Sequence, residues 1–307
     1  MALQGVLRAG HVQIRVTDMT AALKHYTDVL GLIETGRDNK GCVYLKAWDE
    51  FDHHSVVLRE ADSPGMDLMA FKVSDDDSLD RFESGLREFG VEVESIPEGQ
   101  QLALGRRVAF VAPAGHRFEL YVDKEVVGNG LPEVNPDVWP DGLVGMHPTH
   151  FDHCLLYGDG VAETVKLFTD VLDFNVTEQV VSKDGGLIGA FLTCSTKTHD
   201  VAFIQSPDRG RFHHAAFYLE SWGDIQRAAD IIRKNDVSLD IGPTRHGISR
   251  GLTVYFFDPS GNRNEVFAGG YMYYPDRPTI TWTEDQLGKA IFYYEGRINE
   301  RFLTVTT

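Results

Sequence analysis

Residues Thr27-Asp-Val-Leu-Gly-Leu32 recur in the second half of the chain as Thr169-Asp-Val-Leu-Asp-Phe174. Three further blocks recur in the same order: His11 as His153, His53-His-Ser-Val-Val-Leu58 as His199-Asp-Val-Ala-Phe-Ile204, and Pro113-Ala-Gly-His-Arg-Phe-Glu119 as Pro259-Ser-Gly-Asn-Arg-Asn-Glu265. The displacement between partners is nearly the same for all four blocks. Such a pattern predicts an internal duplication, with one fold repeated in each half of the chain.

Each half shows a strand, a helix and then several strands, and this pattern occurs twice per half. The alternation in His11–Val16 is typical of a half-buried strand, and apolar residues at helical spacing follow it. The four expected helices carry these apolar stripes: Leu23, Tyr26 and Leu30; Leu79, Phe82, Leu86 and Phe89; Val161, Val165, Phe168 and Leu172; Ile225, Ala229 and Ile232. The sequence therefore predicts an α+β protein of four βαβββ units, two per domain.

Glycine and proline cluster between the halves, and hydrophobic periodicity disappears from Val126 to Pro148. This stretch is the expected linker. We therefore predict one domain over residues 1–130, a second over residues 148–285, and a C-terminal segment over residues 286–307 that packs near the active site.

The composition is typical of a globular protein with small-molecule partners. The chain has 307 residues, 42% of them hydrophobic, which is enough for two cores. Its formal charge of -17 argues against binding to nucleic acid or an anionic membrane, since both require clustered Lys and Arg. Cys42, Cys154 and Cys194 are widely spaced and indicate buried thiols. Without a signal peptide or a membrane-spanning run, we expect a cytoplasmic protein.

The halves differ at one position that could bind a metal. His214 stands where the first half has Leu68, in an alignment anchored by Ala70-Phe71 and Ala216-Phe217. With His153 and Glu265 it completes a set of two histidines and one carboxylate. Such a set suits Fe(II) with open positions for substrates, although its composition also fits zinc.

Two points stay open on residue pattern alone. His213 and His214 are adjacent on one expected strand and should point to opposite faces, so the alignment does not choose between them. His11 and Glu119 keep the matching positions of the first half without a third ligand, and we interpret them as structural remnants.

The stretch Thr244-Arg-His246, seven residues, and Val254-Tyr255-Phe-Phe-Asp258-Pro259-Ser-Gly261-Asn-Arg-Asn-Glu265 resembles the signature of extradiol ring-cleavage dioxygenases. The resemblance covers the whole chain and is greatest to the catechol 2,3-dioxygenases. It implies the duplicated vicinal-oxygen-chelate fold, in which the βαβββ units form mixed β-barrels. It also implies Fe(II) as cofactor, catechols and dioxygen as substrates, and a homotetramer.

Carried over residue by residue, the resemblance implies that His153, His214 and Glu265 bind the metal, which favours His214 over His213. It further implies that His199, His246 and Tyr255 act on substrate and protons. The first half has Ala109 and Gln100 near the positions of Tyr255 and His246, so it should be inactive. We also expect Phe191, Ile291 and Phe302 to line the substrate pocket.

The implied reaction is extradiol cleavage of catechol to 2-hydroxymuconic semialdehyde, in the breakdown of aromatic compounds. Two alternatives use the same fold. One is a glyoxalase-like isomerase or a metal-dependent thiol transferase, which usually needs other ligands. The other is a binding module, in which a complete ligand set would have no purpose.

Overall fold

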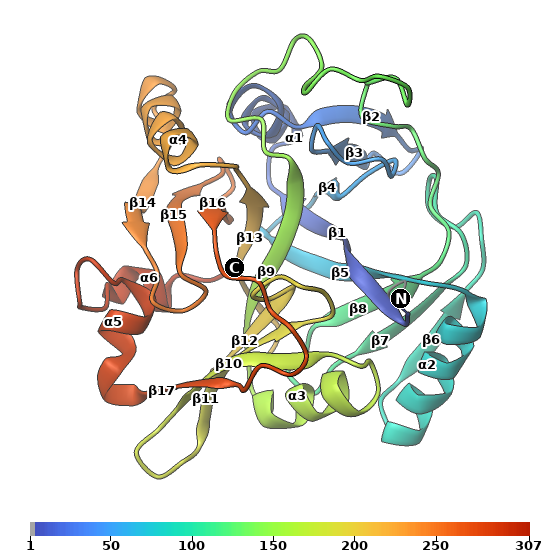
Figure 1. Ribbon diagram of the computed structural model, residues 1–307. Helices are drawn as coiled ribbons and strands as arrows, with labels where there is room; N and C mark the ends of the chain where they lie inside the picture. Colours follow the sequence, from blue (N-terminus) through green and yellow to red (C-terminus); the bar gives the residue numbers. More distant parts are fainter. Residues whose placement is uncertain (1–3) are drawn as a thin grey trace.

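The computed structural model describes residues 4–307 and contains the four predicted βαβββ units (Figure 1). The first half consists of β1 (Val6–Val16), α1 (Met19–Lys24) with the π-helical turn η1 (His25–Val29), β2 (Ile33–Arg37), β3 (Val43–Lys46) and β4 (Val56–Glu60), then β5 (Gly65–Val73), α2 (Asp76–Phe89), β6 (Val93–Ile96), β7 (Arg107–Val111) and β8 (Arg117–Tyr121).

The second half repeats this order and adds a C-terminal extension. It consists of β9 (His150–Gly158), α3 (Val161–Asp170), β10 (Asn175–Val181), β11 (Leu187–Thr193) and β12 (Val201–Gln205), then β13 (Arg211–Tyr218), α4 (Trp222–Lys234), β14 (Leu239–Arg245), β15 (Gly251–Phe257) and β16 (Arg263–Gly269). The extension holds β17 (Ile280–Thr283), the 3₁₀ turn η2 (Glu284–Gln286), α5 (Leu287–Ile291) and α6 (Glu300–Thr304).

The strands of each half form one large mixed sheet. The first sheet has the order β2-β3-β4-β1-β5-β8-β7-β6, and the second has β14-β15-β16-β13-β9-β12-β11-β10-β17. Apart from β17, the second order is the first one read backwards with corresponding strands exchanged. The predicted duplicated α+β fold is therefore confirmed.

The helices begin where the sequence offers a capping side chain. Asp18, Asp75 and Ser221 each accept a hydrogen bond from a backbone amide in the first turn of α1, α2 and α4. The predicted apolar stripe of α2 is buried at Leu79, Phe82 and Leu86. In α4 the buried alanine is Ala228, not the expected Ala229, because Ala228 lies between Ile225 and Ile232 on the face that packs on the sheet.

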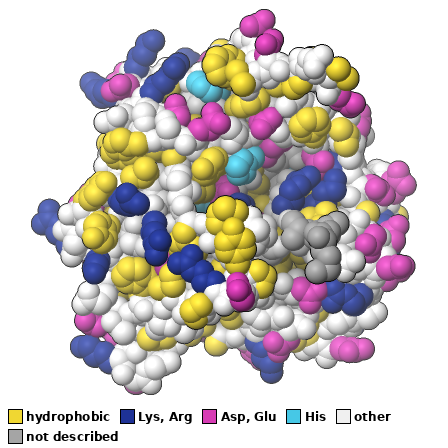
Figure 2. All heavy atoms as spheres, in the orientation of Figure 1, with side chains coloured by type: hydrophobic (Ala, Val, Ile, Leu, Met, Phe, Trp, Pro, Cys, Tyr) yellow, Lys and Arg dark blue, Asp and Glu magenta, His cyan; other side chains and the backbone are white. Residues whose placement is uncertain are grey.

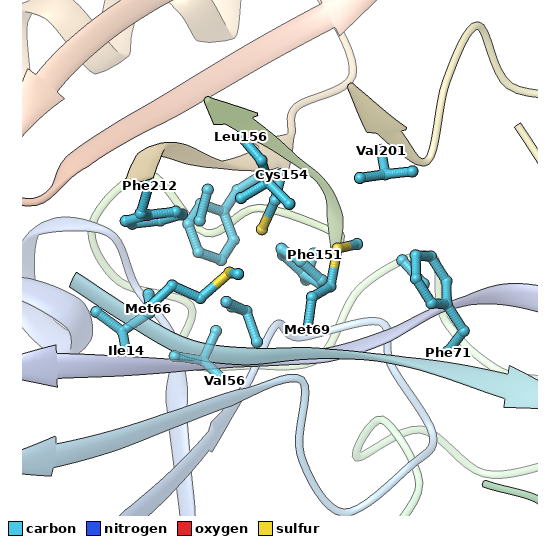
Figure 3. Close-up of a cluster of buried hydrophobic side chains, with 14 of the residues drawn as sticks. Ile14, Val56, Met66, Met69, Phe71, Phe151, Cys154, Leu156, Val201 and Phe212 are labelled. Atoms are coloured by element: carbon cyan, nitrogen blue, oxygen red, sulfur yellow. The ribbon is translucent and has the colours of Figure 1, made fainter. Parts of the chain in front are cut away.

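The two halves share one hydrophobic core. Figure 3 shows Met66, Met69 and Phe71 of β5 facing Phe151, Cys154 and Leu156 of β9. Aromatic pairs also cross the boundary, with ring centroids 5.1 Å apart for Phe118 and Phe168 and 5.2 Å apart for Phe71 and Phe174. Burial of these rings requires both halves to be folded.

Polar contacts join the first half to the turn between β15 and β16. Asn262 Nδ2 donates to the carbonyl of Arg15 at 2.9 Å, and Tyr26 Oη donates to Asp258 Oδ2 at 3.2 Å. Asn264 Nδ2 lies 3.0 Å from His25 Nε2. The first half thereby supports the strand that carries Glu265.

The surface agrees with the charge argument. On the face in Figure 2, Lys and Arg side chains lie in small groups separated by hydrophobic and uncharged groups, and Asp and Glu gather toward the right edge. Among residues 4–307, no helix is long and apolar enough to cross a membrane. The connection between the halves runs over the outside of the molecule as an irregular loop (Figure 1).

Candidate metal centre

Strand register sets three of the predicted site residues side by side. His153 on β9 is paired with Ala216 on β13, Ala216 with Glu265 on β16, and Glu265 with Tyr255 on β15. Side chains opposite one another on neighbouring strands share a face of the sheet. Ala216 lies between His153 and Glu265, and its small side chain leaves space between the two larger ones.

Strand alternation brings His214 into this group, because it lies two residues before Ala216 on β13, and a register shift precedes it. The shift lies between Phe212 and His214, where β13 pairs with β9. The two adjacent histidines do not simply point to opposite faces, as the sequence predicts, because the shift leaves His213 Nδ1 only 2.7 Å from His214 Nδ1. His213 stacks on Tyr157 and its Nε2 lies 2.6 Å from the carbonyl of Phe302.

The side chains of His153, His214 and Glu265 converge on one point. Glu265 Oε2 lies 3.3 Å from His153 Nε2 and 3.1 Å from His214 Nε2, and the two Nε2 atoms are 3.4 Å apart. All three residues are buried. Ligands bound at about 2.1 Å to one first-row ion lie roughly 3.0 to 3.4 Å apart in octahedral or tetrahedral arrangements. The three residues therefore fit a single metal ion, and their spacing alone does not choose which one.

The charges in this cluster also fit a cation. Burial would raise the pKa of Glu265, but hydrogen bonds with His153, His214 and His246 hold it well below the ordinary value. Burial lowers the pKa of His214 to about 4. Among the described residues, Glu265 forms ion pairs only with histidines, without Lys or Arg. Burial would lower the pKa of His153, but hydrogen bonds with Asp152 and Glu265 raise it to about 8, so a bound cation would take the place of its proton beside the buried carboxylate.

His199, His246 and Tyr255 surround this cluster. The rings of His199 and His153 are 4.1 Å apart, and burial holds the pKa of His199 well below its ordinary value. Tyr255 Oη lies 2.8 Å from His246 Nε2, while His246 Nδ1 is hydrogen-bonded to the carbonyl of Ile291. Since a carbonyl only accepts, His246 Nδ1 carries the hydrogen and Nε2 accepts from the Tyr255 hydroxyl.

The cluster lies in a cavity of about 470 Å³ with mostly apolar walls. Phe191, Ile291 and Phe302, the three residues expected in a pocket, all line it. His153, His199, His214, His246, Tyr255 and Glu265 line it as well. The structure thus brings every predicted site residue to one cavity.

In the first half, basic side chains lie beside the residues that correspond to His153 and Glu265. Register again pairs His11 with Ala70, Ala70 with Glu119, and Glu119 with Ala109. Buried Arg107 lies 2.7 Å from Glu119, and Lys124 Nζ lies 3.2 Å from His11 Nδ1. The carboxylate of Glu119 is therefore already paired with a guanidinium, so it does not require a metal ion to balance its charge.

Sequence reasoning missed Asp152, Lys197 and His213. Asp152 Oδ1 lies 2.8 Å from His153 Nδ1, and Lys197 Nζ lies 3.1 Å from Asp152 Oδ2. Comparison of the halves could have found Asp152 and Lys197, because Gly10 and Phe51 hold the corresponding positions. The role of His213 was hidden, since no sequence pattern predicts the register shift beside it.

The fold and this site define the class of protein. Residues 150–266 match the Glyoxalase/Bleomycin resistance protein/Dioxygenase superfamily, and residues 66–125 match the catechol 2,3-dioxygenase-like N-terminal domain.

Individual relatives define the family. A metapyrocatechase of Pseudomonas sp. (strain CF600) is 57% identical over 99% of both chains. A manganese-dependent 2,3-dihydroxybiphenyl 1,2-dioxygenase of Geobacillus genomosp. 3 is 29% identical over 94% of both. The crystal structure of the 2,3-dioxygenase LapB from Pseudomonas sp. KL28 has a TM-score of 0.90 and 49% identity, covering 92% of this chain and 99% of that one. The chain therefore belongs to the metapyrocatechase, or catechol 2,3-dioxygenase, family of extradiol dioxygenases.

Membership of this family makes the chain a metal-dependent enzyme whose substrates are a small molecule and dioxygen. The isomerase, thiol transferase and binding-module alternatives are disfavoured, because the relatives that match over nearly the whole chain are metapyrocatechases and dioxygenases.

Proposed function

We propose that the chain cleaves catechol with dioxygen beside, and not between, the two hydroxylated carbons, and that the product is 2-hydroxymuconic semialdehyde. The main observation that supports this proposal is the convergence of His153, His214 and Glu265, whose ligand atoms all lie within 4.8 Å of one another in the apolar cavity. The 57% identity to a metapyrocatechase supports catechol as the substrate.

Fe(II) is the proposed metal, held by His153, His214 and Glu265. A site with one carboxylate and two neutral imidazoles suits the ferrous state. Tyr255, which lies beside the cluster, has a pKa well above its ordinary value because of burial and the charge of Glu265, which favours the neutral phenol over a tyrosinate ligand. Bound iron would hold catechol and dioxygen together and mediate electron transfer between them.

The surrounding side chains supply binding and proton handling. Phe191, Ile291 and Phe302 form an apolar wall that suits a single aromatic ring and excludes water from it. His199, kept neutral by burial beside His153, can accept a proton and return it during the reaction. His246 Nε2 accepts from Tyr255 Oη, so the phenol oxygen can receive a hydrogen bond from a substrate hydroxyl.

The domain bounds, assembly and location of the protein are proposed from the family and from the sequence pattern. We propose domains over residues 1–130 and 148–285, with residues 286–307 as a segment beside the active site. This division agrees with two sheets built from residues 6–121 and 150–283. A homotetramer is proposed from the family resemblance alone, and the cytoplasmic location expected from the sequence pattern also remains a proposal.

Product analysis tests the proposal. The metal-free protein should be loaded with Fe(II) without oxygen, and then mixed with catechol and dioxygen. We expect a yellow product with the mass of 2-hydroxymuconic semialdehyde. Recovery of cis,cis-muconate as the main product would contradict extradiol cleavage.

Single variants test the ligands. His153→Ala, His214→Ala and Glu265→Ala should each lose bound iron and activity, whereas the matched first-half variants His11→Ala and Glu119→Ala should keep both. Loss of iron from a first-half variant, with retention in its partner, would show that the wrong half was assigned. Loading with Mn(II) in place of Fe(II) tests the metal, and greater activity with manganese would overturn the iron assignment.

A further inference from the structure

We propose that Asp152 and Lys197 are positioning residues for the metal ligand His153. In this proposal the Asp152 carboxylate, held by the Lys197 ammonium, fixes the ring orientation and tautomer of His153 and strengthens it as a ligand. The inference rests on the proposed metal site and goes beyond it by assigning roles to two residues that touch neither metal nor substrate.

The contact between Asp152 and His153 determines which ring nitrogen is free. Asp152 Oδ1 lies 2.8 Å from His153 Nδ1, and a carboxylate only accepts hydrogen bonds. His153 Nδ1 therefore carries a hydrogen, and the lone pair of the neutral ring is on Nε2. That atom faces Glu265 Oε2 at 3.3 Å and His214 Nε2 at 3.4 Å. A negative charge behind the ring also increases the electron density that Nε2 offers to a cation.

Lys197 holds the carboxylate of Asp152 in place. Its Nζ lies 3.1 Å from Asp152 Oδ2, 2.7 Å from the Asp152 carbonyl and 2.9 Å from Asp200 Oδ1. The ammonium thus donates a hydrogen bond to the Asp152 carbonyl and forms an ion pair with each of the two carboxylates. The side chain of Asp152 is only 4% exposed, and a carboxylate so deeply buried requires such a partner.

Lys197 also joins the ligand to the residue expected to move protons. Asp200 follows His199 directly, and it is anchored by Thr193 Oγ1 at 2.8 Å and the Cys194 amide at 3.0 Å. The ammonium therefore links the residue beside His153 on β9 to the residue beside His199 at the start of β12. This link keeps the His199 ring beside that of His153.

The first half of the duplication is an internal control. Gly10, Phe51 and His54 occupy the positions of Asp152, Lys197 and Asp200, so the half with the incomplete ligand set lacks all three groups. There, His11 Nδ1 lies 3.2 Å from Lys124 Nζ. When Lys124 is charged, its ammonium donates, so Nδ1 accepts and the ring hydrogen is on Nε2, the atom that corresponds to the proposed ligand atom of His153.

Four variants separate positioning from general stability. Asp152→Asn keeps the shape and removes the charge. Lys197→Met removes the ammonium, and Lys197→Arg restores a cation. Lys72→Met is the matched control, because Lys72 pairs with Asp52 in the first half with side chains 23% and 8% exposed, close to the 28% and 4% of Lys197 and Asp152.

Metal affinity is the first readout, measured without oxygen by competition between the metal-free protein and a chelator for Fe(II). We expect Asp152→Asn and Lys197→Met to weaken binding by about 10- to 100-fold, the usual effect of losing a group that orients a metal ligand. Lys197→Arg should recover most of the affinity. Lys72→Met should bind iron as the unaltered chain does.

The second readout is the rise in Tm when iron is added to the metal-free protein. Weaker binding reduces this rise, because the stabilisation that a ligand gives grows with the logarithm of its affinity for the folded state. A purely structural ion pair would instead lower Tm equally with and without iron. Lys197→Met provides this test even if Asp152→Asn fails to fold.

Unchanged iron affinity in Lys197→Met, or an equal loss in Lys72→Met, would overturn the positioning role. The result for His214→Ala keeps the two proposals distinct. Suppose that the unaltered chain binds iron, that His214→Ala does not bind it, and that Lys197→Met binds it as tightly as the unaltered chain. Only the positioning role then fails. If His214→Ala binds iron as well as the unaltered chain, the metal site itself is wrong.

Discussion

Glu265 and Glu119 occupy equivalent positions, and their neighbours give them different chemistry. Glu119 is paired with buried Arg107 at 2.7 Å, whereas the residue corresponding to Arg107 in the second half is Thr253, whose hydroxyl donates to Glu265 Oε1 at 2.5 Å. A hydroxyl contributes a hydrogen bond without a positive charge. The negative charge of Glu265 is therefore left for a metal ion.

Among single residues, His199 and His246 should affect turnover more than metal binding. His199→Asn and His246→Asn should each keep bound iron and lower kcat by roughly 10²- to 10⁴-fold, because each removes a group that can hold a proton. Iron content and steady-state kinetics check this. His147→Asn, in the linker outside the cavity lining, is the control. A variant that lost its iron would mark that histidine as a ligand instead.

Lys124 should make the stability of the protein depend on pH. Burial lowers the pKa of Lys124 to about 7, while in the unfolded chain it keeps the ordinary value of 10.5. Between these values the unfolded chain holds a proton that the folded chain has released, so this lysine's contribution to the free energy of unfolding rises with pH. Below about pH 7 both states are charged and the dependence disappears.

Lys124→Met provides the comparison, because it removes the titrating group and keeps an apolar chain of similar length. The free energy of unfolding of the unaltered protein, minus that of the variant, should increase from about pH 7 to pH 10. Urea unfolding at several pH values measures it. A difference that stayed constant or fell over this range would contradict the lowered pKa.

At the scale of elements, the C-terminal segment forms one wall of the cavity. The ring of Phe302 in α6 lies 4.8 Å from that of Tyr255 and 4.9 Å from that of Phe292, and its carbonyl accepts from His213 Nε2 at 2.6 Å. The end of the chain also pairs with β13, where Thr307 and Phe212 exchange two backbone hydrogen bonds. A short helix thus contributes to both the apolar wall and the support of the histidine strand.

Phe302→Ala should therefore lower the free energy of unfolding by roughly 3 kcal/mol, since it removes a buried aromatic ring. It should also raise KM for catechol more than it lowers kcat, because the ring is proposed to form part of the substrate wall and not to act on the reacting oxygens. Tyr293→Ala is the control, as Tyr293 belongs to the same segment and is half exposed. An unchanged KM would show that Phe302 is not part of the substrate wall.

At the scale of the whole molecule, the core between the halves should make unfolding cooperative. Residues of both sheets belong to one continuous core, and the turn at Asp258 is hydrogen-bonded to the first half. Urea unfolding followed by far-UV circular dichroism and by tryptophan fluorescence should give coincident transitions. Trp48 reports on the first half, and Trp222 and Trp282 on the second. Two separated transitions would show that the halves are independent.

The duplication explains how much was predictable. Repeated blocks predicted two similar halves built of βαβββ units, and the replacement of Leu68 by His214 identified the half with the complete ligand set. Both inferences depend on local pattern and spacing, which a sequence displays directly. The helix caps Asp18, Asp75 and Ser221 also depend on local sequence, because a helix N-terminus needs a hydrogen-bond acceptor close in sequence.

By itself, then, the sequence determined the fold class, the family and the identity of the proposed ligands. Only the tertiary structure decided which side chains and backbone groups support those ligands. Lys197 reaches Asp152 across 45 positions of sequence, and the Phe302 carbonyl reaches His213 across 89. The register shift in β13 depends on the pairing of β13 with β9. Hydrogen-bond partners so distant in sequence are set by how strands pack, and no local pattern encodes that packing.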